Sequence, residues 1–452
     1  MKYNLRAVSA EITKAFKKAS IGKGKDSGFA LAISKKTVED RFNQCSLTSC
    51  NGNMQATAAF CVQMVRTELM EGGDGKEVVV KEPLEETVVI FASALLRDAV
   101  ETLGNMEDKI FLIYDEDTNK LEVKNKKSSL PIPIVPPFTM LEIPKNLKSV
   151  NAVVEKEELV SALKYVNVAL GRSSKSKFES SYGIKPMVDE SKAVLHIFAC
   201  DEKSASYQHI GLVAMSDKYK ELCEDVMYAM LPSDKVSQII AESEHDKVRF
   251  TIYYESKSAK QVNIKTGSDM YQILTKTNCV YPQSSKKYVD QAYDMYEASF
   301  QTDVSSLKSA FQVTALGAAP NQVKSVMQIS NGSLTISDES GERVTKLNGI
   351  ETKLGQPDKT ITINVATDLI MSALGPFNNE KIRIQGSNED TNGLISLVGG
   401  KKGVHIAVFP VKGKVKVEEI VEEEDRENRD ENEDTVSDEA ESGQDANLDE
   451  EE

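Results

Sequence analysis

One short pattern occurs three times in this chain, about a third of the chain apart, and it constrains the fold more than any other feature. The copies begin at Ile12, Leu159 and Leu307, and each places apolar residues at the spacing of one helix face. The period is far longer than the roughly 50 residues of a solenoid repeat. The 452 residues are enough for three domains of about 150 residues each. The pattern therefore predicts three duplicated domains.

A second pattern follows each copy of the first. It joins a short apolar strand to a helix through a Ser or Thr, which we expect to cap the helix. Farther along come an acid, a lysine and a β-branched residue, before a predicted hairpin. The expected caps are Ser93, Ser233 and Thr367, and the lysines of the three triplets are Lys109, Lys247 and Lys381.

Each repeat thus contains a helix with strands, followed by a second helix with strands. Helices on one face of antiparallel sheets define the α+β class. Two joints separate the repeats, one rich in proline and one polar and aromatic. The last residues form a run of like charges with few apolar side chains, which we expect to be disordered. The predicted domains are residues 1–138, 139–290 and 291–417, with a disordered acidic tail at 418–452.

The net charge of −15 misrepresents the body of the chain. Residues 417–452 hold nineteen acids against two arginines, a net of −17, which leaves +2 for residues 1–416. The body is near neutral and rich in lysine. A nucleic-acid partner is therefore compatible with the acidic overall composition.

Several classes of function lack their signatures in this sequence. The six cysteines contain no C-x-x-C pair, and the four histidines do not complete a zinc spacing with them. The glycine-rich runs near residues 22 and 399 lack the P-loop pattern, and no G-x-S-x-G or H-E-x-x-H occurs. No apolar run reaches the roughly 18 residues of a membrane span. We expect an intracellular, soluble binding protein, with no enzyme activity, cofactor or metal.

Basic residues gather in and just after the helices of the first pattern. A solvated polar face explains any single lysine, but the clustering of lysines on equivalent helices indicates a shared binding role. Lysines that meet only phosphates give salt-sensitive duplex binding without sequence preference. The third repeat is poorer in such residues.

The residues together resemble a family, the bacterial-type DNA sliding clamp, the β subunit of replicative DNA polymerase III. The resemblance rests on the ordered patterns above, the opening Met1-Lys-Tyr, the helix at Glu157 and the apolar-Pro-apolar run at Val408. It implies two three-domain subunits joined head to tail in a ring, with helices lining the hole. It further implies a cytoplasmic processivity factor that encircles duplex DNA and binds polymerase and clamp loader. For a viral member the compartment is the host cytoplasm.

The resemblance also implies three sets of site residues. Residues expected to face DNA are Lys14, Lys17, Lys18, Lys23, Lys25, Arg97, Lys164, Arg172, Lys175, Lys177, Lys235 and Lys308. A cleft for partner peptides would use Ile184, Cys200, Ala205, Pro232, Val236, Val408, Phe409, Pro410 and Val411. The subunit interface would join Lys124, Lys126, Lys127, Leu130 and Ile132 to Asp338, Glu339 and Glu342.

Two features depart from the family and keep an alternative open. The family's Gly-His-Arg-Leu run after an aspartate is replaced by Asp201-Glu-Lys-Ser-Ala205, and an acidic tail follows the last apolar run. The tail is either a solubilising extension or a screen over the basic lining or the cleft. The alternative function is a clamp-fold adaptor or decoy, which would bind clamp-interacting proteins without encircling DNA.

Overall fold

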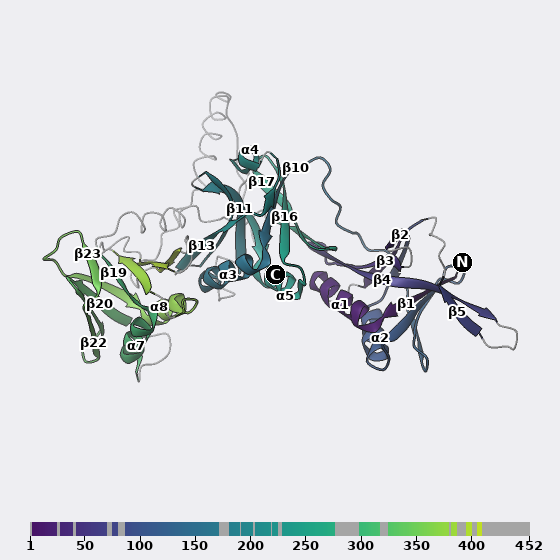
Figure 1. Ribbon diagram of the computed structural model, residues 1–452, viewed down its shortest axis with the longest axis horizontal. Coiled ribbons are helices and arrows are strands. Elements are labelled where there is room, and N and C mark those ends of the chain that lie inside the picture. Colours follow the sequence, from purple (N-terminus) through teal and green to yellow (C-terminus); the bar gives the residue numbers. More distant parts are fainter. Residues whose placement is uncertain are drawn as a thin grey trace, which may run out of the picture. The chain divides into compact units, whose positions relative to one another are not determined.

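The computed structural model (Figure 1) divides the chain into a body, Met1–Gly413, and a second unit, Lys414–Glu452. The residues it describes are 2–24, 28–38, 42–69, 75–79, 86–170, 180–189, 191–201, 204–217, 219–224, 228–275, 298–316, 324–378, 381–386, 395–399 and 405–408. The predicted acidic tail lies outside them. The α+β class is confirmed, since helices alternate with antiparallel strands throughout the described residues.

The elements repeat in one order, in which a strand and a helix precede three long strands, then a strand, a helix and three strands. Repeat 1 holds β1 (Lys2–Val8), α1 (Ser9–Ala19), η1 (Ser20–Gly22), β2 (Phe29–Val38), β3 (Phe42–Cys50), β4 (Met54–Leu69), β5 (Gly75–Val79), β6 (Val88–Ala92), α2 (Leu95–Gly104), β7 (Lys109–Asp115), β8 (Lys120–Lys124) and β9 (Ser129–Ile132).

The other two repeats follow the same order with small insertions. Repeat 2 holds β10 (Lys148–Glu155), α3 (Lys156–Val166), η2 (Asn167–Ala169), β11 (Ser181–Asp189), β12 (Lys192–Cys200), β13 (Ser204–Gly211), β14 (Ala214–Met215), α4 (Tyr219–Glu224), β15 (Ala229–Pro232), α5 (Ser233–Glu242), β16 (Lys247–Glu255), β17 (Ser258–Thr266) and β18 (Asp269–Leu274). Repeat 3 holds β19 (Ala298–Asp303), α7 (Val304–Ala315), β20 (Lys324–Ser330), β21 (Ser333–Asp338), β22 (Val344–Asn348), β23 (Glu351–Leu354), β24 (Ile361–Ala366), α8 (Thr367–Leu374), β25 (Lys381–Gly386), β26 (Ile395–Gly399) and β27 (His405–Val408).

The acid-lysine triplets occupy the same place in every repeat. In each, the lysine pairs across the sheet with the last strand residue before the first helix, and the three pairs are Val8–Lys109, Glu155–Lys247 and Asp303–Lys381. In repeats 1 and 2 the first helical residue also donates its backbone N–H to the triplet's acid, Ser9 to the carbonyl of Asp108 and Lys156 to that of Asp246. The sequence pattern therefore marks one structural joint, formed three times.

Each repeat contains two groups of four strands, and the pairing continues from one repeat into the next. In repeat 1 one group follows the order β1-β7-β8-β9 and the other β6-β2-β3-β4, and pairing of β1 with β4 joins them in one sheet. The last strand of repeat 2, β18, pairs with β4 of repeat 1, and the last strand of repeat 3, β27, pairs with β13 of repeat 2. The same type of edge-to-edge pairing thus joins both pairs of neighbours.

The core forms where the helices cover these sheets. The apolar stripe of α1 is buried, with Ile12 and Phe16 at 0 % exposure, as its 3.6-residue spacing predicts. α1 packs beside α2, and α7 beside α8 (Figure 1). Each repeat has its own large apolar cluster. The cluster of repeat 2 also takes in Ile21, Met54 and Ala56 from repeat 1, so this joint is packed as well as hydrogen-bonded.

The prediction that Ser93, Ser233 and Thr367 cap their helices through their side chains is wrong. α2 begins at Leu95, two residues after Ser93, and its N-cap residue makes no side-chain bond. Ser233 is itself the first residue of α5, and its hydroxyl donates to the carbonyl of Ser180 at 2.9 Å. Thr367 likewise begins α8 and bonds the hydroxyl of Ser325 at 2.7 Å. In repeats 2 and 3 these hydroxyls tie the helix start to the residues beside it in space.

Candidate nucleic-acid interface and partner sites

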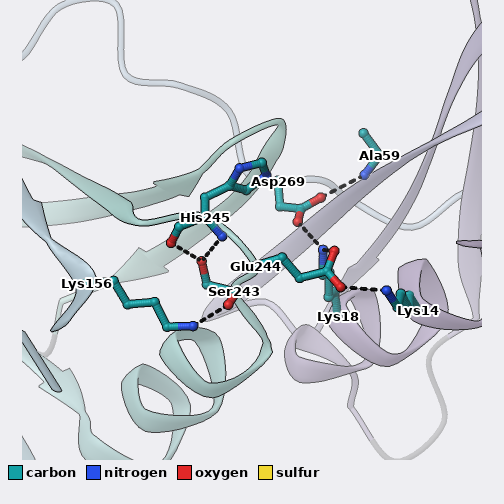
Figure 2. A network of polar contacts seen from close by, with 8 residues as sticks. All are labelled: Lys14, Lys18, Ala59, Lys156, Ser243, Glu244, His245 and Asp269. Carbon is teal, nitrogen blue, oxygen red and sulfur yellow. Dashed lines mark hydrogen bonds and ion pairs between the residues drawn. The ribbon is translucent and has the colours of Figure 1, made fainter.

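Helix α1 presents its lysines on the side away from the buried stripe, as the sequence predicts. The structure adds that these lysines reach acids of repeat 2, and Figure 2 shows the contacts of Lys14 and Lys18. The contacts join Lys14 Nζ to Glu244 Oε1 at 2.6 Å, Lys17 Nζ to Glu242 Oε1 at 2.8 Å, and Lys18 Nζ to Asp269 Oδ2 at 2.8 Å and Glu244 Oε2 at 3.8 Å. We call these three lysines and three acids the clasp.

The members of the clasp differ in burial. The side chain of Lys18 is 12 % exposed and that of Asp269 is 3 % exposed. By contrast, Lys14 and Glu244 are 60 % and 55 % exposed, and Lys17 is 69 % exposed. Exposed pairs are screened by water and salt, whereas a buried pair loses much when one partner is removed. The clasp therefore has one structural pair and two weaker ones.

Asp269 also ends the strand pairing between the two repeats. Its Oδ1 accepts the backbone N–H of Ala59 at 3.1 Å, just beyond the paired residues of β4 and β18. Within the seam, the amide of Gln55 donates to Gln272 at 2.8 Å and accepts the backbone N–H of Leu141 at 2.7 Å. These polar contacts between repeats fix the register of the seam.

Residues 243–246 hold Glu244 in place. The hydroxyl of Ser243 accepts the backbone N–H of His245 at 3.3 Å, and the ammonium of Lys156 donates to the carbonyl of Ser243 (Figure 2). The pKa of Lys14 is raised because Glu244 accepts a hydrogen bond from its ammonium. The pKa of Glu244 is lowered by that hydrogen bond and by the charge of Lys18. Both shifts favour the charged pair.

The other residues predicted to face DNA lie on several elements. Lys164 is exposed on α3. Arg97 pairs with Asp98 at 2.8 Å on α2, and Lys235 approaches Asp234 at 3.9 Å on α5. The remaining described ones are Lys23, whose ammonium lies 5.6 Å from the ring centre of Phe29, and Lys308, which donates to the carbonyl of Phe377 at 3.2 Å. Lys25, Arg172, Lys175 and Lys177 fall outside the described residues.

Most of the described residues of the predicted cleft lie on successive strands of one sheet, β15-β11-β12-β13-β27, and Val236 lies on α5. Ile184 and Val236 belong to the core of repeat 2. Cys200 and Ala205 pair across β12 and β13 and belong to a separate cluster with Phe198 and Tyr207. The two remaining described positions are Pro232, which pairs with Ser181, and Val408, whose backbone pairs with Ser204. Phe409, Pro410 and Val411 lie outside the described residues.

The two predicted halves of the subunit interface each lie along the last strand of a sheet. Lys124 ends β8, and Lys126 and Lys127 lie in the turn before β9; all three are exposed. On β9, Leu130 is 37 % exposed and Ile132 is buried.

The acidic half sits in the hairpin of β21 and β22. The carboxylate of Asp338 accepts the backbone N–H groups of Glu342 and Arg343, at 3.0 and 3.2 Å, so it holds the turn. Glu339 pairs with Lys324 at 3.1 Å, and Glu342 is exposed.

Sequence reasoning missed four residues at these sites. Val344 is 52 % exposed on β22, beside the acidic residues predicted to form one half of the subunit interface. Glu242, Glu244 and Asp269 were not singled out, because nothing local in the sequence connects them to α1. Lys14 and Glu244 are 230 positions apart.

Comparison with known proteins identifies the architecture. A scan of protein-family models and a search of curated proteins returned no match. Solved structures do match over nearly the whole chain. The beta sliding clamp of C. crescentus aligns with a TM-score of 0.65 at 11 % identity, covering 91 % of this chain and 100 % of its own. This chain has the sliding-clamp fold.

Two further clamps give the same result. The Bacillus subtilis DNA polymerase sliding clamp aligns with a TM-score of 0.63 at 12 % identity, covering 91 % of this chain and 99 % of its own. The DNA polymerase III subunit beta of Pseudomonas aeruginosa aligns with a TM-score of 0.62 at 14 % identity, with the same coverage. The resemblance drawn from the sequence patterns is therefore confirmed at the level of the fold.

Two searches of the described residues bear on other classes of function. Among these residues, no helix combines the length and apolar character needed to cross a membrane. Within the same part of the chain, no group of three or more His, Cys, Asp or Glu side chains is placed to hold a metal ion.

Proposed function

We propose that this protein is a DNA sliding clamp that works as a processivity factor and has no enzyme activity. The observation that carries the proposal is the full-length match to clamp structures, which cover 99–100 % of their own chains. The protein would encircle duplex DNA without sequence preference and tether the replicative polymerase. Its clamp loader and polymerase would bind between repeats 2 and 3. The proposed compartment is the cytoplasm.

The repeat suggests how a ring would close. Inside the chain, the last strand of one repeat pairs with the fourth strand of the repeat before it, as β18 does with β4 and β27 with β13. Among the described strands, β9 has only β8 as a ladder partner and β22 has only β21. We infer that β9 of one copy pairs with β22 of a second copy. Two such joints make a closed head-to-tail dimer of six similar units.

The side chains at these two edges suit one another. β9 offers Leu130 and β22 offers Val344, both partly exposed. Lysines 124, 126 and 127 flank the first edge and Glu342 the second. Apolar contacts at the centre with opposite charges at the rim are usual in stable interfaces. An unpaired strand edge is also costly to leave exposed, which favours its pairing.

A closed ring explains a clamp that carries no catalytic group. Retention is topological, so the lining can be weakly basic and the ring can slide. Tethering then raises the effective concentration of the polymerase at the primer end. The partner cleft stays a proposal on the resemblance alone, because its last residues lie outside the described part of the chain.

The test is retention on DNA. The protein, with a clamp loader, should stay on closed circular duplex at high salt and be lost when the circle is cut. A protein that runs as a monomer at micromolar concentration and leaves circular and linear DNA alike would contradict the proposal. The adaptor alternative predicts full function when Lys17, Arg172 and Lys175 are neutralised, with Lys18 left intact because it forms the buried pair with Asp269. The full-length likeness to clamps favours the ring.

A further inference from the structure

The lysines of α1 are already occupied by carboxylates in the protein alone. Lys14, Lys17 and Lys18 contact Glu244, Glu242 and Asp269, so three positive charges meet three negative ones. A wall with this composition has little net potential for a polyanion. These are also the residues expected to meet DNA, so the clasp and duplex binding compete for the same ammonium groups.

The burial of the three pairs divides them into two kinds. Lys18 and Asp269 are nearly enclosed, and Asp269 also holds the N–H of Ala59. Lys14 and Lys17 are more than half exposed, so solvent and ions reach them freely. A carboxylate at an exposed pair is held weakly and can be replaced by another anion. Lys18 is bound to the carboxylate that also accepts the N–H of Ala59 beside the seam between β4 and β18.

The backbone around Glu244 is held in a fixed position. Glu244 lies in residues 243–246, which are held by the Ser243–His245 bond and by Lys156 at the start of α3 (Figure 2). The following Asp246 receives the backbone N–H of Lys156, the joint that recurs in the repeats. Glu244 is therefore attached to one of the fixed joints of the fold.

We propose that Glu244 and Glu242 pair with Lys14 and Lys17 when no DNA is bound, and that duplex phosphates replace these two carboxylates. The pair of Lys18 with Asp269 stays intact. This inference rests on the proposed function, because it regulates the same DNA-facing surface. The acids weaken the grip on DNA and favour sliding. They also make the contact between repeats 1 and 2 sensitive to bound DNA.

The first experiment needs no DNA. The full chain is treated briefly with an amine acetylating reagent, and each lysine's modification rate is read by mass spectrometry. Lys14 and Lys17 should react several-fold faster in the Glu242→Gln/Glu244→Gln variant than in the wild type. Lys192, exposed at the start of β12, should be unchanged and serves as the internal control. Equal rates for Lys14 and Lys17 in the two proteins would overturn the proposal, whatever the protein does with DNA.

The second experiment measures binding of a short linear duplex over a range of salt concentrations. Glu242→Gln/Glu244→Gln should bind about tenfold tighter at low salt, since two lysines no longer need to be released. Lys14→Gln/Lys17→Gln should reduce the slope of log K against log salt concentration by up to about 1.8 in magnitude, because each phosphate contact adds about 0.9 to that slope. The matched control is Glu116→Gln/Asp117→Asn, which removes two exposed charges at the turn between β7 and β8.

The outcomes separate this inference from the function on which it rests. Faster acetylation together with tighter duplex binding supports both. Faster acetylation with no duplex binding by any variant supports the clasp and overturns the exchange with phosphate, while the proposed function is still decided by retention on closed circular DNA. Normal duplex binding that Lys14→Gln/Lys17→Gln leaves unchanged overturns the exchange but spares the proposed function. Equal tightening by the Glu116/Asp117 control would show a general charge effect and overturn the inference.

Discussion

At the scale of single residues, Asp269 is a buried carboxylate that links repeat 2 to repeat 1. Its two carboxylate oxygens accept from groups of repeat 1, the ammonium of Lys18 and the backbone N–H of Ala59. Both donors would be left poorly solvated without it. A buried charge that loses its partner is far more costly than an exposed one.

Replacement of Asp269 by Ala should lower the free energy of unfolding by about 3 kcal/mol, the range for a broken buried pair. Urea denaturation followed by circular dichroism measures this. Asp269→Asn should lose less, because its amide oxygen still accepts from Ala59. Equal losses for Ala and Asn would show that the charge, and not the N–H contact, carries the effect. No loss in either would contradict the assignment.

Glu244 gives a prediction about pH. Its pKa is lowered in the folded protein, mainly by its hydrogen bond to Lys14. A depressed carboxyl pKa stabilises the fold above the unfolded value of about 4.3 and loses this effect as pH falls through the folded value. The thermal midpoint of the wild type should therefore exceed that of Glu244→Gln near neutral pH. The two should converge in acid, and a gap that widens below pH 4 would contradict the pairing.

At the scale of elements, turns decide where the clasp residues point. Gly267 lies in the turn between β17 and β18 with a φ of +59°, and a Cβ built there would overlap the ring of His245. His245 follows Glu244 directly. The turn before Asp269 is therefore packed against the segment that carries Glu244, so both acids depend on one glycine.

Gly267→Ala should destabilise the protein by about 2–3 kcal/mol, from positive-φ strain and overlap with His245. Gly52→Ala is the matched control, since Gly52 has a φ of +87° and open space around it, and it should cost about 1 kcal/mol. Acetylation of Lys14 should accelerate only in the Gly267 variant. Similar effects of the two substitutions on stability would show that the His245 contact is unimportant.

The elements were predicted from the sequence better than their contacts were. The burial of Ile12 and Phe16 followed from helical spacing, because the side chains of one helix face must pack on something. The hydroxyls of Ser233 and Thr367 were expected to cap their helices and instead bond neighbouring residues. A cap would use the hydroxyl oxygen to accept a helix N–H. Ser233 instead donates its O–H to the carbonyl of Ser180, which the tertiary fold brings close.

At the scale of the whole molecule, the proposed dimer depends on the edges of the sheets. The chain uses one kind of strand pairing at both of its internal seams, and among the described strands β9 and β22 are left to repeat it between copies. Leu130 and Val344 are the partly exposed apolar residues at these edges. Their contribution can be tested without touching the core.

Leu130→Asp and Val344→Asp should each convert the protein to a single chain of 49.8 kDa, because a carboxylate at the centre of an interface is buried without a partner. Sedimentation should give twice this mass for the wild type. Val89→Asp is the control, since Val89 is 44 % exposed on the edge strand β6. A wild-type monomer at micromolar concentration, or dissociation by Val89→Asp as well, would contradict the proposed joint.

The sequence by itself determined the three repeats, the α+β class and the buried face of each first helix. These follow from patterns within short stretches of chain, where spacing alone selects which side chains share a face. Tertiary structure decided that the three α1 lysines meet acids of repeat 2 and that β4 continues into β18. Such contacts join residues more than 200 positions apart, and no local spacing encodes them. The threefold pattern predicted the repeats, and the packing between repeats decided which charged side chains pair.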